Sequence, residues 1–328
     1  MTNHAKGEIV CEYIRKYPTI QKLTLARLIF KERPEAFRDV EDCRSVIRYY
    51  TGANGKASLK RVLGGANADL IGLNQLPPSE KEEREDFILP KVNNNCLVIG
   101  DTHIPYQDNQ AIDACLNWAV EKRVNTILMI GDIMDFYRLS KFVQDPRKRD
   151  FQFELDCGYE FISHVRNALP RVKIFYLPGN HEYRLERYWM IKAPELLGVT
   201  DYRMDDLLHF SDFSVTYLRH SQLIQAGDLW IGHGDEFKTR SNPVSPARTF
   251  ALKGKINYLG GHWHITSEFS WRRADGKVEG CWSMGGLCGL YPEYRPYNDW
   301  NHGFAHVRIN PDGTFRIFNA KIENGKVQ

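Results

Sequence analysis

The sequence lacks the features of a membrane-spanning or disulfide-stabilised protein. No stretch approaches the roughly 18 consecutive apolar residues of a transmembrane helix. The N-terminal residues MTNHAKGEIV contain neither the apolar core nor the small-residue cleavage site of a signal peptide. The seven cysteines are scattered and include no CxxC pair, a pattern typical of free thiols in a reducing compartment. We therefore predict a cytoplasmic protein without a membrane segment, a disulfide framework or a cysteine zinc site.

Charge is distributed unevenly along a chain of otherwise ordinary composition. Its 328 residues, 42% hydrophobic and 26% charged, are enough for about two domains. Residues 1–70 contain 13 Lys and Arg against 8 Asp and Glu, a net charge of +5, whereas the rest of the chain has a net charge of −2. A basic segment ahead of a near-neutral body indicates a polyanionic partner.

The basic segment, residues 1–73, is predicted to be a small helical domain. Apolar residues recur at helical spacing over residues 9–17 and again over residues 23–30. A third helix is predicted to begin after Asp39, a suitable N-cap, and to end at Gly52.

The third predicted helix is the candidate for binding nucleic acid. Arg44 and Arg48 are four residues apart and share one of its faces, and Lys56 and Lys60 follow closely. Three short helices with a basic third one are compatible with a helix-turn-helix unit that binds DNA or RNA. A small helical bundle with a solvated basic face is the alternative.

Residues 74–95 are predicted to be a linker, and residues 96–328 a second domain of the α/β class. The linker combines two prolines, a charge run and three consecutive asparagines without apolar periodicity. Beyond it, apolar strands at 96–99, 126–130 and 172–177 alternate with predicted helices at 109–122 and 152–168. This alternation predicts parallel strands with helices on the faces of the sheet. From residue 214 onward the strands follow one another closely, which favours a second sheet.

Several predicted strands end in a glycine followed by side chains that can bind a metal ion. The five motifs are Gly100-Asp101-Thr102-His103, Gly131-Asp132-Ile133-Met134-Asp135, Gly179-Asn180-His181-Glu182, Gly232-His233-Gly234-Asp235 and Gly261-His262-Trp263-His264. Because the carboxyl ends of parallel strands gather at one crevice, we expect the motifs to meet there. Alternate residues of an extended segment point the same way, so Asp101 and His103 can reach one ion. The two histidines of the last motif can be divided between two adjacent ions.

These motifs, in this order, resemble the DxH, GDxxD, GNH(E/D), GH and GHxH motifs of the calcineurin-like metallophosphoesterase superfamily. The resemblance covers roughly residues 96–310. It implies two mixed β-sheets packed face to face and flanked by helices, here preceded by the small N-terminal helical domain. It also implies a binuclear metal centre that hydrolyses phosphate esters. Chance placement of polar residues at strand ends does not account for the ordered set.

The resemblance implies seven ligands for two divalent transition-metal ions. Asp101, His103 and His264 would bind one ion, Asn180, His233 and His262 the other, and Asp132 would bridge both. We expect manganese, although this mixed nitrogen and oxygen set also suits iron, zinc or nickel. Two ions about 3.5–4 Å apart acidify a shared water, and the metal-bridging hydroxide so formed attacks phosphorus.

The remaining polar residues near the motifs are expected to act on the leaving group and the phosphate. His181 resembles the catalytic histidine of the superfamily and would protonate or stabilise the leaving oxygen, with Asp135 orienting it by a hydrogen bond. Arg184 and Arg187 on a predicted helix, and Arg138 beyond the second motif, are candidates for binding the substrate phosphate. Solvated surface charge is the alternative for Asp135 and for the three arginines.

The class of phosphate ester is the least defined feature. The second motif lacks the DRG continuation typical of protein Ser/Thr phosphatases, which disfavours protein dephosphorylation. A nuclease-like phosphodiesterase is the leading hypothesis, because of the basic segment and of residues 291–300, an aromatic and basic loop suited to stacking bases or to core packing. The arrangement also resembles phage-encoded members of the superfamily with an N-terminal helical domain. The alternatives are a phosphomonoesterase, a small-nucleotide phosphodiesterase, or a binding module with a vestigial site, which the complete ligand set disfavours.

Overall fold

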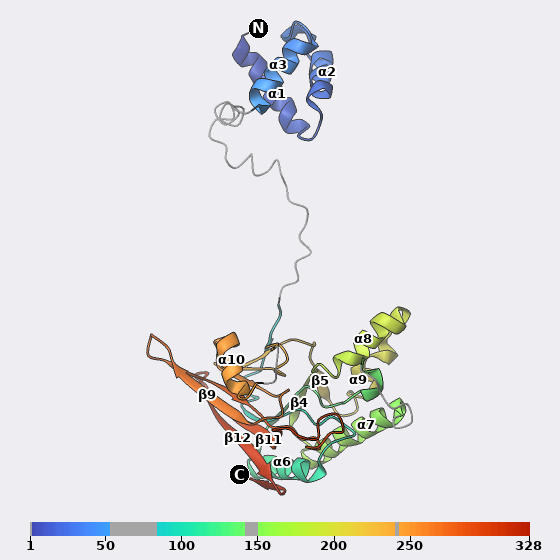
Figure 1. Ribbon diagram of the computed structural model, residues 1–328, viewed down its shortest axis with the longest axis vertical. Helices are drawn as coiled ribbons and strands as arrows, with labels where there is room; N and C mark the ends of the chain where they lie inside the picture. The colour runs from blue at the N-terminus through green and yellow to red at the C-terminus, as the bar shows by residue number, and fades with distance from the viewer. Residues whose placement is uncertain (1, 53–83, 142–149, 240–242) are drawn as a thin grey trace. The chain divides into compact units, whose positions relative to one another are not determined.

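The structure is a computed structural model that describes residues 2–52, 84–141, 150–239 and 243–328 (Figure 1). The chain divides into two compact units, Met1–Glu83 and Arg84–Gln328. Among the described residues, no helix is both long enough and apolar enough to cross a membrane.

The N-terminal unit contains the three helices that the sequence predicts. They are α1 (Asn3–Lys16), α2 (Lys22–Glu32) and α3 (Val40–Thr51), with a 3-10 turn, η1 (Pro34–Ala36), between the last two. Apolar side chains from all three helices form one core in which Val10, Ile29 and Ile47 are fully buried. The predicted cap of α3 is confirmed, because the Asp39 carboxylate accepts a 2.7 Å hydrogen bond from the Asp42 amide.

The connection before α3 is longer than in a simple helix-turn-helix unit. Residues 33–39, including η1, join α2 to α3, whereas that motif has a turn of about 3–4 residues. The helix-turn-helix interpretation therefore stays a prediction. Lys56, Lys60 and residues 74–83 of the predicted linker lie outside the described residues.

The C-terminal unit contains two mixed β-sheets. Sheet I has the strand order β13 (Lys326–Val327), β12 (Phe315–Glu323), β11 (His302–Ile309), β2 (Asn95–Ile99), β3 (Thr126–Ile130), β4 (Lys173–Leu177) and β5 (Val215–Tyr217). Sheet II has the order β1 (Phe87–Ile88), β6 (Ile224–Ala226), β7 (Leu229–Ile231), β8 (Tyr258–Gly260), β10 (Val278–Ser283) and β9 (Ser267–Arg272). Strands β2, β3, β4 and β5 run parallel, as do β7 and β8.

The two sheets pack face to face, and helices cover their outer faces. Alternation along β2 directs Cys96 and Val98 into the core between the sheets. Leu97 and Ile99 point to the opposite core, under α6 (Asn109–Glu121) and α7 (Phe151–Ala168), which lie along one side of the unit (Figure 1). Helix α10 (Pro246–Gly254) covers the outer face of sheet II. The predicted fold class is confirmed.

Two predictions about the C-terminal unit were wrong in part. Residues 84–95, predicted as the end of the linker, belong to this unit, because β1 pairs with β6 and Phe87 packs against Phe175 with ring centroids 5.2 Å apart. Strands β5, β11 and β12 join sheet I, whereas the sequence placed them in a second sheet. Because each sheet buries a face against the same core, the apolar pattern of a strand does not reveal which sheet it joins.

Candidate metal centre

The polar motifs of both sheets meet at the carboxyl ends of their parallel strands. Asp101 and Asp132 follow the adjacent strands β2 and β3, and Asn180 follows β4. From sheet II, His233 follows β7 and the GHxH turn follows β8. The structure brings all seven candidate ligands to this edge.

One half of the cluster consists of Asp101, His103 and His264. The Nε2 atoms of His103 and His264 are 3.2 Å apart, and the latter is 3.3 Å from Oδ1 of Asp101. These three side chains are buried. Nδ1 of His103 donates to Asp135 Oδ1 at 3.1 Å, which leaves the Nε2 lone pair directed into the cluster.

The other half is built around Asp132 and His233. His233 Nε2 lies 3.2 Å from Asp132 Oδ2 and 3.2 Å from Nδ1 of His262. Nδ1 of His233 donates to the carbonyl of Ile130 at 2.9 Å, so its other nitrogen faces the cluster. Asp132 Oδ2 is also 4.0 Å from His103 Nε2, which places this carboxylate between the two halves.

The donor atoms of the cluster fit divalent transition-metal ions. Oδ1 of Asp101 and Oδ1 of Asn180 are buried, and neither accepts a hydrogen bond in the described part of the chain. Buried polar oxygens without partners are costly, and cations at the cluster would satisfy both. Together with imidazole nitrogens and carboxylates, they form a mixed set of the kind that binds manganese, iron, zinc or nickel.

Most of the candidate ligands have strained backbones. Five of the seven have positive φ angles: Asp101 (53°), His103 (48°), Asp132 (52°), His262 (69°) and His264 (56°). For residues other than glycine such angles cost on the order of 1–3 kcal/mol each and concentrate at functional sites. The extended conformation predicted between Asp101 and His103 was therefore wrong, although both side chains do reach the same half of the cluster.

Two glycines of the motifs are required by close packing behind the cluster. A Cβ atom on Gly131 would lie 2.6 Å from Nδ1 of His233, and φ at this glycine is +94°. A Cβ atom on Gly179 would lie 2.5 Å from Oδ1 of Asp132. Only glycine lets these two loops approach the candidate ligands so closely.

Asp135 lies between His103 and His181, the candidate catalytic histidine. Its Oδ1 atom is 3.1 Å from Nδ1 of each ring. The backbone amide of His181 donates to Asp132 Oδ1 at 2.8 Å, and its Nε2 is 3.7 Å from Asp132 Oδ2. His181 thus lies against the cluster, and one ligand atom each from His181, His103 and Asp132 lie within 4.8 Å of one another.

The three candidate phosphate-binding arginines differ in position. Arg184 is at the cluster, where it donates to the carbonyl of Asp135 at 2.8 Å and to Nε2 of His181 at 2.7 Å. Arg187 lies farther along α8 (Tyr183–Lys192), and Arg138 is exposed in the 3-10 turn η2 (Tyr137–Leu139). No hydrogen bond or ion pair links either of these two to the cluster among the residues that the structure covers.

The electrostatics of the cluster favour the metal-binding ionisation state at the carboxylates and at His262, but the protonated state at His233 and His264. Burial opposes ionisation of Asp132, but His181 and His233 hold its pKa well below the usual value. Burial likewise opposes ionisation of Asp135, and hydrogen bonds from His103 and His181 lower its pKa nonetheless. Burial and neighbouring His233 lower the pKa of His262 to about 4. These groups are ready to accept a cation.

Burial opposes protonation of His233 and His264, but Asp132 raises the pKa of His233 well above its usual value. Cys288 and Asp101 raise the pKa of His264 to about 10. These two rings therefore release a proton when they bind a cation.

Glu182 is an organising residue to which the sequence interpretation gave no role. Its buried carboxylate accepts hydrogen bonds from the backbone amides of Asp132 (2.9 Å), Ile133 (2.7 Å), Met134 (3.0 Å) and Gly179 (2.8 Å), and from the hydroxyl of Tyr176 (2.8 Å). It thereby fixes the loop that carries Asp132 to the loop that carries Asn180. Its position as the last residue of the third motif was the available signal.

Glu182→Gln is expected to destabilise the C-terminal unit. The glutamine keeps the shape but directs an NH₂ group at N–H donors, so we expect a loss of about 1.5–3 kcal/mol, the range for hydrogen bonds to a charged group. Urea unfolding followed by tryptophan fluorescence measures this, since all seven tryptophans lie beyond residue 83. Exposed Glu186, four residues on, is the control, and Glu186→Gln should change stability by less than about 0.5 kcal/mol. Equal stability of the two variants would contradict the role of Glu182.

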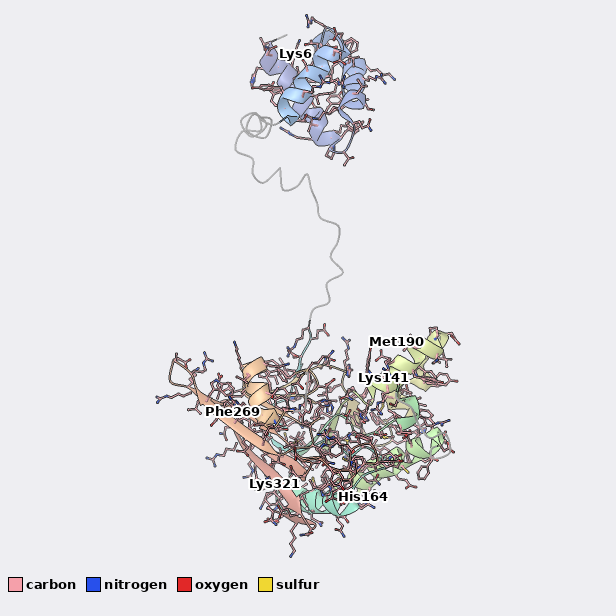
Figure 2. All side chains as sticks on the ribbon, viewed as in Figure 1. Lys6, Lys141, His164, Met190, Phe269 and Lys321 are labelled. Carbon is pink, nitrogen blue, oxygen red and sulfur yellow. The ribbon has the colours of Figure 1, made fainter. Side chains whose placement is uncertain are left out.

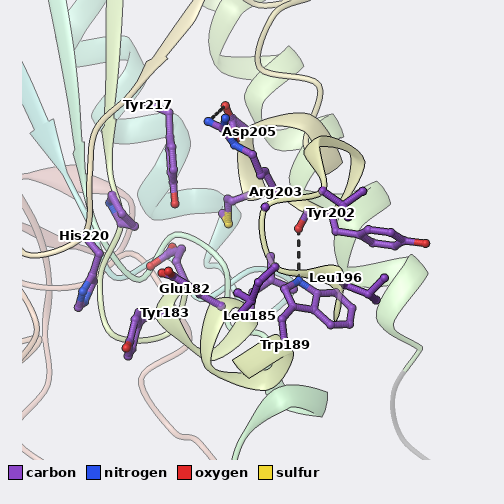
Figure 3. A pocket seen from close by; sticks show the side chains of 16 residues that line it. Glu182, Tyr183, Leu185, Trp189, Leu196, Tyr202, Arg203, Asp205, Tyr217 and His220 are labelled. Atoms are coloured by element: carbon purple, nitrogen blue, oxygen red, sulfur yellow. Dashed lines mark hydrogen bonds and ion pairs between the residues drawn. The ribbon is translucent and has the colours of Figure 1, made fainter. Parts of the chain in front are cut away.

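A cavity lies beside the cluster, on the side of α8. It measures about 220 Å³ and is bounded by α8 and by residues 196–205, with Trp189 and Tyr202 in its wall and Glu182 at one end (Figure 3). The indole nitrogen of Trp189 donates to the carbonyl of Tyr202 at 3.3 Å. None of the seven candidate ligands lines this cavity, so it is separate from the metal centre.

Two residues outside the motifs contact His264. Sγ of Cys288 lies 3.5 Å from its Nδ1, and the Trp300 ring lies 4.1 Å from its ring, centroid to centroid. Cys288 precedes the aromatic loop, residues 291–300, and Trp300 is the last residue of that loop. The density of aromatic residues there was a sequence signal for Trp300, but no pattern pointed to Cys288.

Fold and cluster together define a metal-dependent hydrolase of phosphate esters. The strand-end carboxylates and histidines of two packed sheets supply candidate ligands for a dimetal site. The chain belongs to the calcineurin-like phosphoesterase family, whose sequence profile matches residues 95–279.

Individual relatives are distant. The chain is 24% identical over 182 residues to the Gene 54 protein of Mycobacterium phage L5, a match that covers 53% of this chain and 70% of that protein. Among solved structures, it is similar to Vacuolar Protein Sorting 29 of Cryptosporidium parvum (TM-score 0.39, 14% identity, 72% of this chain and 94% of that one). A dimetal phosphatase of Danio rerio is similar to a comparable degree (TM-score 0.35, 12% identity, 69% and 96%). Family membership rests on the match over residues 95–279 and not on these overall similarities.

Proposed function

We propose that the chain is a manganese-dependent phosphodiesterase that hydrolyses nucleic acid. Asp101, His103 and His264 would hold one ion, Asn180, His233 and His262 the other, and Asp132 both. Two such ions acidify a shared water and neutralise charge that develops on the phosphoryl oxygens. The position of Asp132 between the two halves supports its bridging role.

The residues next to the cluster would handle the phosphate and the leaving group. Because an arginine only donates, His181 accepts from Arg184 at Nε2 and carries its proton at Nδ1, toward Asp135. A phosphate oxygen that draws Arg184 away frees Nε2 of His181 to take up a proton and to donate it to the leaving oxygen. Asp135, held ionised, stabilises that protonated ring.

The observation that carries the choice of nucleic acid is a separate basic unit joined to the hydrolase. Residues 2–52 contain 10 Lys and Arg against 7 Asp and Glu. Arg48 is exposed on α3, next to Tyr49, which is 63% exposed. Arg44 is less available, because it forms an ion pair with Glu41 at 2.8 Å. A unit of this kind, which contributes no candidate ligand, suits a role in binding a polyanion.

Removing residues 1–83 is expected to separate binding from chemistry. Every candidate ligand lies beyond this cut, so hydrolysis of bis(4-nitrophenyl) phosphate should persist within about twofold, the scatter of a remote change. Binding to DNA or RNA should weaken. The slope of log Kd against log salt concentration should fall by about 0.7–0.9 for each phosphate contact that is lost. The cut falls before residue 84 because β1 packs against the hydrolase sheets. Kd against salt concentration, by fluorescence anisotropy, measures the effect.

A point variant tests the same idea without deletion. Arg48→Ala combined with Arg44→Ala should reproduce part of the loss of binding, whereas Arg15→Ala with Lys16→Ala, which removes two exposed charges from α1, should reproduce less of it. Unchanged binding by the truncated chain would give the N-terminal unit another role.

A substrate panel tests the function itself. The panel compares a nitrophenyl diester, a nitrophenyl monoester, a cyclic dinucleotide, and single- and double-stranded DNA and RNA. Hydrolysis of the monoester or the cyclic dinucleotide alone would overturn the choice of nucleic acid and favour a phosphomonoesterase or a small-nucleotide phosphodiesterase.

A further inference from the structure

The aromatic loop presents three tyrosine rings to solvent beside the metal centre. Tyr291 is 83% exposed, Tyr294 75% and Tyr297 93%. Single exposed aromatic residues are ordinary on protein surfaces, but three within seven residues of one loop form a patch that favours a ligand with apolar faces.

The loop is attached to the centre through Trp300. The Trp300 ring lies 4.1 Å from His264, and Tyr294 contacts Trp300 edge-on at 6.3 Å between ring centroids. Tyr294 is therefore linked to His264 through a chain of ring contacts. A ligand on Tyr294 would lie two ring contacts away from the candidate metal ligand His264.

Hydrogen bonds hold the loop in one shape before a ligand arrives. The side-chain amide of Asn298 donates to the carbonyls of Leu290 and Arg295, each at 2.8 Å, and its oxygen accepts from the Trp300 amide at 2.9 Å. Pro292 and Pro296 restrict the backbone further. Rings presented by an ordered loop lose little entropy when they bind.

We propose that residues 291–300 stack the unpaired bases of the substrate, so that the enzyme acts on single-stranded rather than double-stranded nucleic acid. This inference rests on the proposed function. Tyrosine faces accept any base that is free to leave its stack, whereas duplex bases are already stacked and paired. The loop also contains Glu293 and Asp299 beside Arg295, so its contribution is stacking and not attraction of phosphates.

The test compares two matched double variants in the full chain. Tyr291→Ala with Tyr297→Ala removes two rings, and Tyr291→Phe with Tyr297→Phe keeps them. KM and kcat are measured on a short single-stranded DNA, the equivalent RNA, the same sequences as duplexes, and bis(4-nitrophenyl) phosphate. Tyr294 is left unchanged because it reaches the centre.

We expect the wild type to prefer single strands. In the alanine variant, KM for single strands should rise about tenfold or more, because the stacking of bases on the two rings is lost. The phenylalanine variant should stay within about threefold of wild type, since stacking needs the ring and not the hydroxyl. The salt dependence of binding should be the same in all three proteins.

Three results would overturn the inference. Equal cleavage of single strands and duplexes by the wild type, or an unchanged KM in the alanine variant, would remove only the single-strand assignment. Hydrolysis of the nitrophenyl diester without hydrolysis of any nucleic acid would remove the proposed function as well, so the two failures are distinguishable.

Discussion

Asp132→Asn is expected to abolish most of the activity and to release metal from both halves of the centre. The asparagine keeps the shape of the side chain and an acceptor for the His181 amide, but it loses the charge that lies 3.2 Å from His233 Nε2 and 4.0 Å from His103 Nε2. Substitution of a residue that only supports a metal ligand typically lowers metal affinity or activity about 10–100-fold. The loss caused by replacing a carboxylate that both ions share should exceed that range.

Metal content by elemental analysis and kcat/KM on bis(4-nitrophenyl) phosphate measure this prediction. The matched control is Asp113→Asn on α6, the same carboxylate-to-amide change at a side chain that is 66% exposed. Tryptophan fluorescence checks that the variant is folded. Two bound ions with near-normal turnover would show that Asp132 does not bridge the halves.

Most elements of the fold were predictable from the sequence, but the short strands β1 and β6 were not. Strands β2, β3 and β4 begin within one residue of their predicted starts, because each is a mainly apolar run that ends at or just before a glycine-containing motif. β1 and β6 are two and three residues long, too short for any periodicity, and they exist because they pair with each other.

The positions of the candidate ligands were predictable because topology alone gathers strand ends. Their local geometry was not, because the positive φ angles of Asp101 and His103 are imposed by packing between distant loops. The same holds for Glu182, whose five donors come from two segments, residues 132–134 and 176–179. Sequence reasoning places motifs on elements, but contacts between loops that are far apart in the chain need the structure.

A second large effect is expected from His181→Ala, which should lower kcat while leaving both ions bound. General acid catalysis typically raises the reaction rate about 10²–10⁴-fold. The loss should be large for substrates with poor leaving groups and small for nitrophenyl esters, whose leaving oxygen needs little protonation. Metal should be retained because His181 lies beside the cluster, with Nε2 on Arg184 and Nδ1 on Asp135.

Asp135→Asn separates the orienting role from the acid role. It should show the same leaving-group pattern more weakly, together with some loss of metal, because Asp135 also accepts the hydrogen bond that fixes His103. His164→Ala is the surface control, since that side chain is 58% exposed at the rim of the unit (Figure 2). A plot of log kcat against leaving-group pKa distinguishes the possibilities. Parallel lines for wild type and His181→Ala would rule out proton donation and leave His181 the role of binding phosphate.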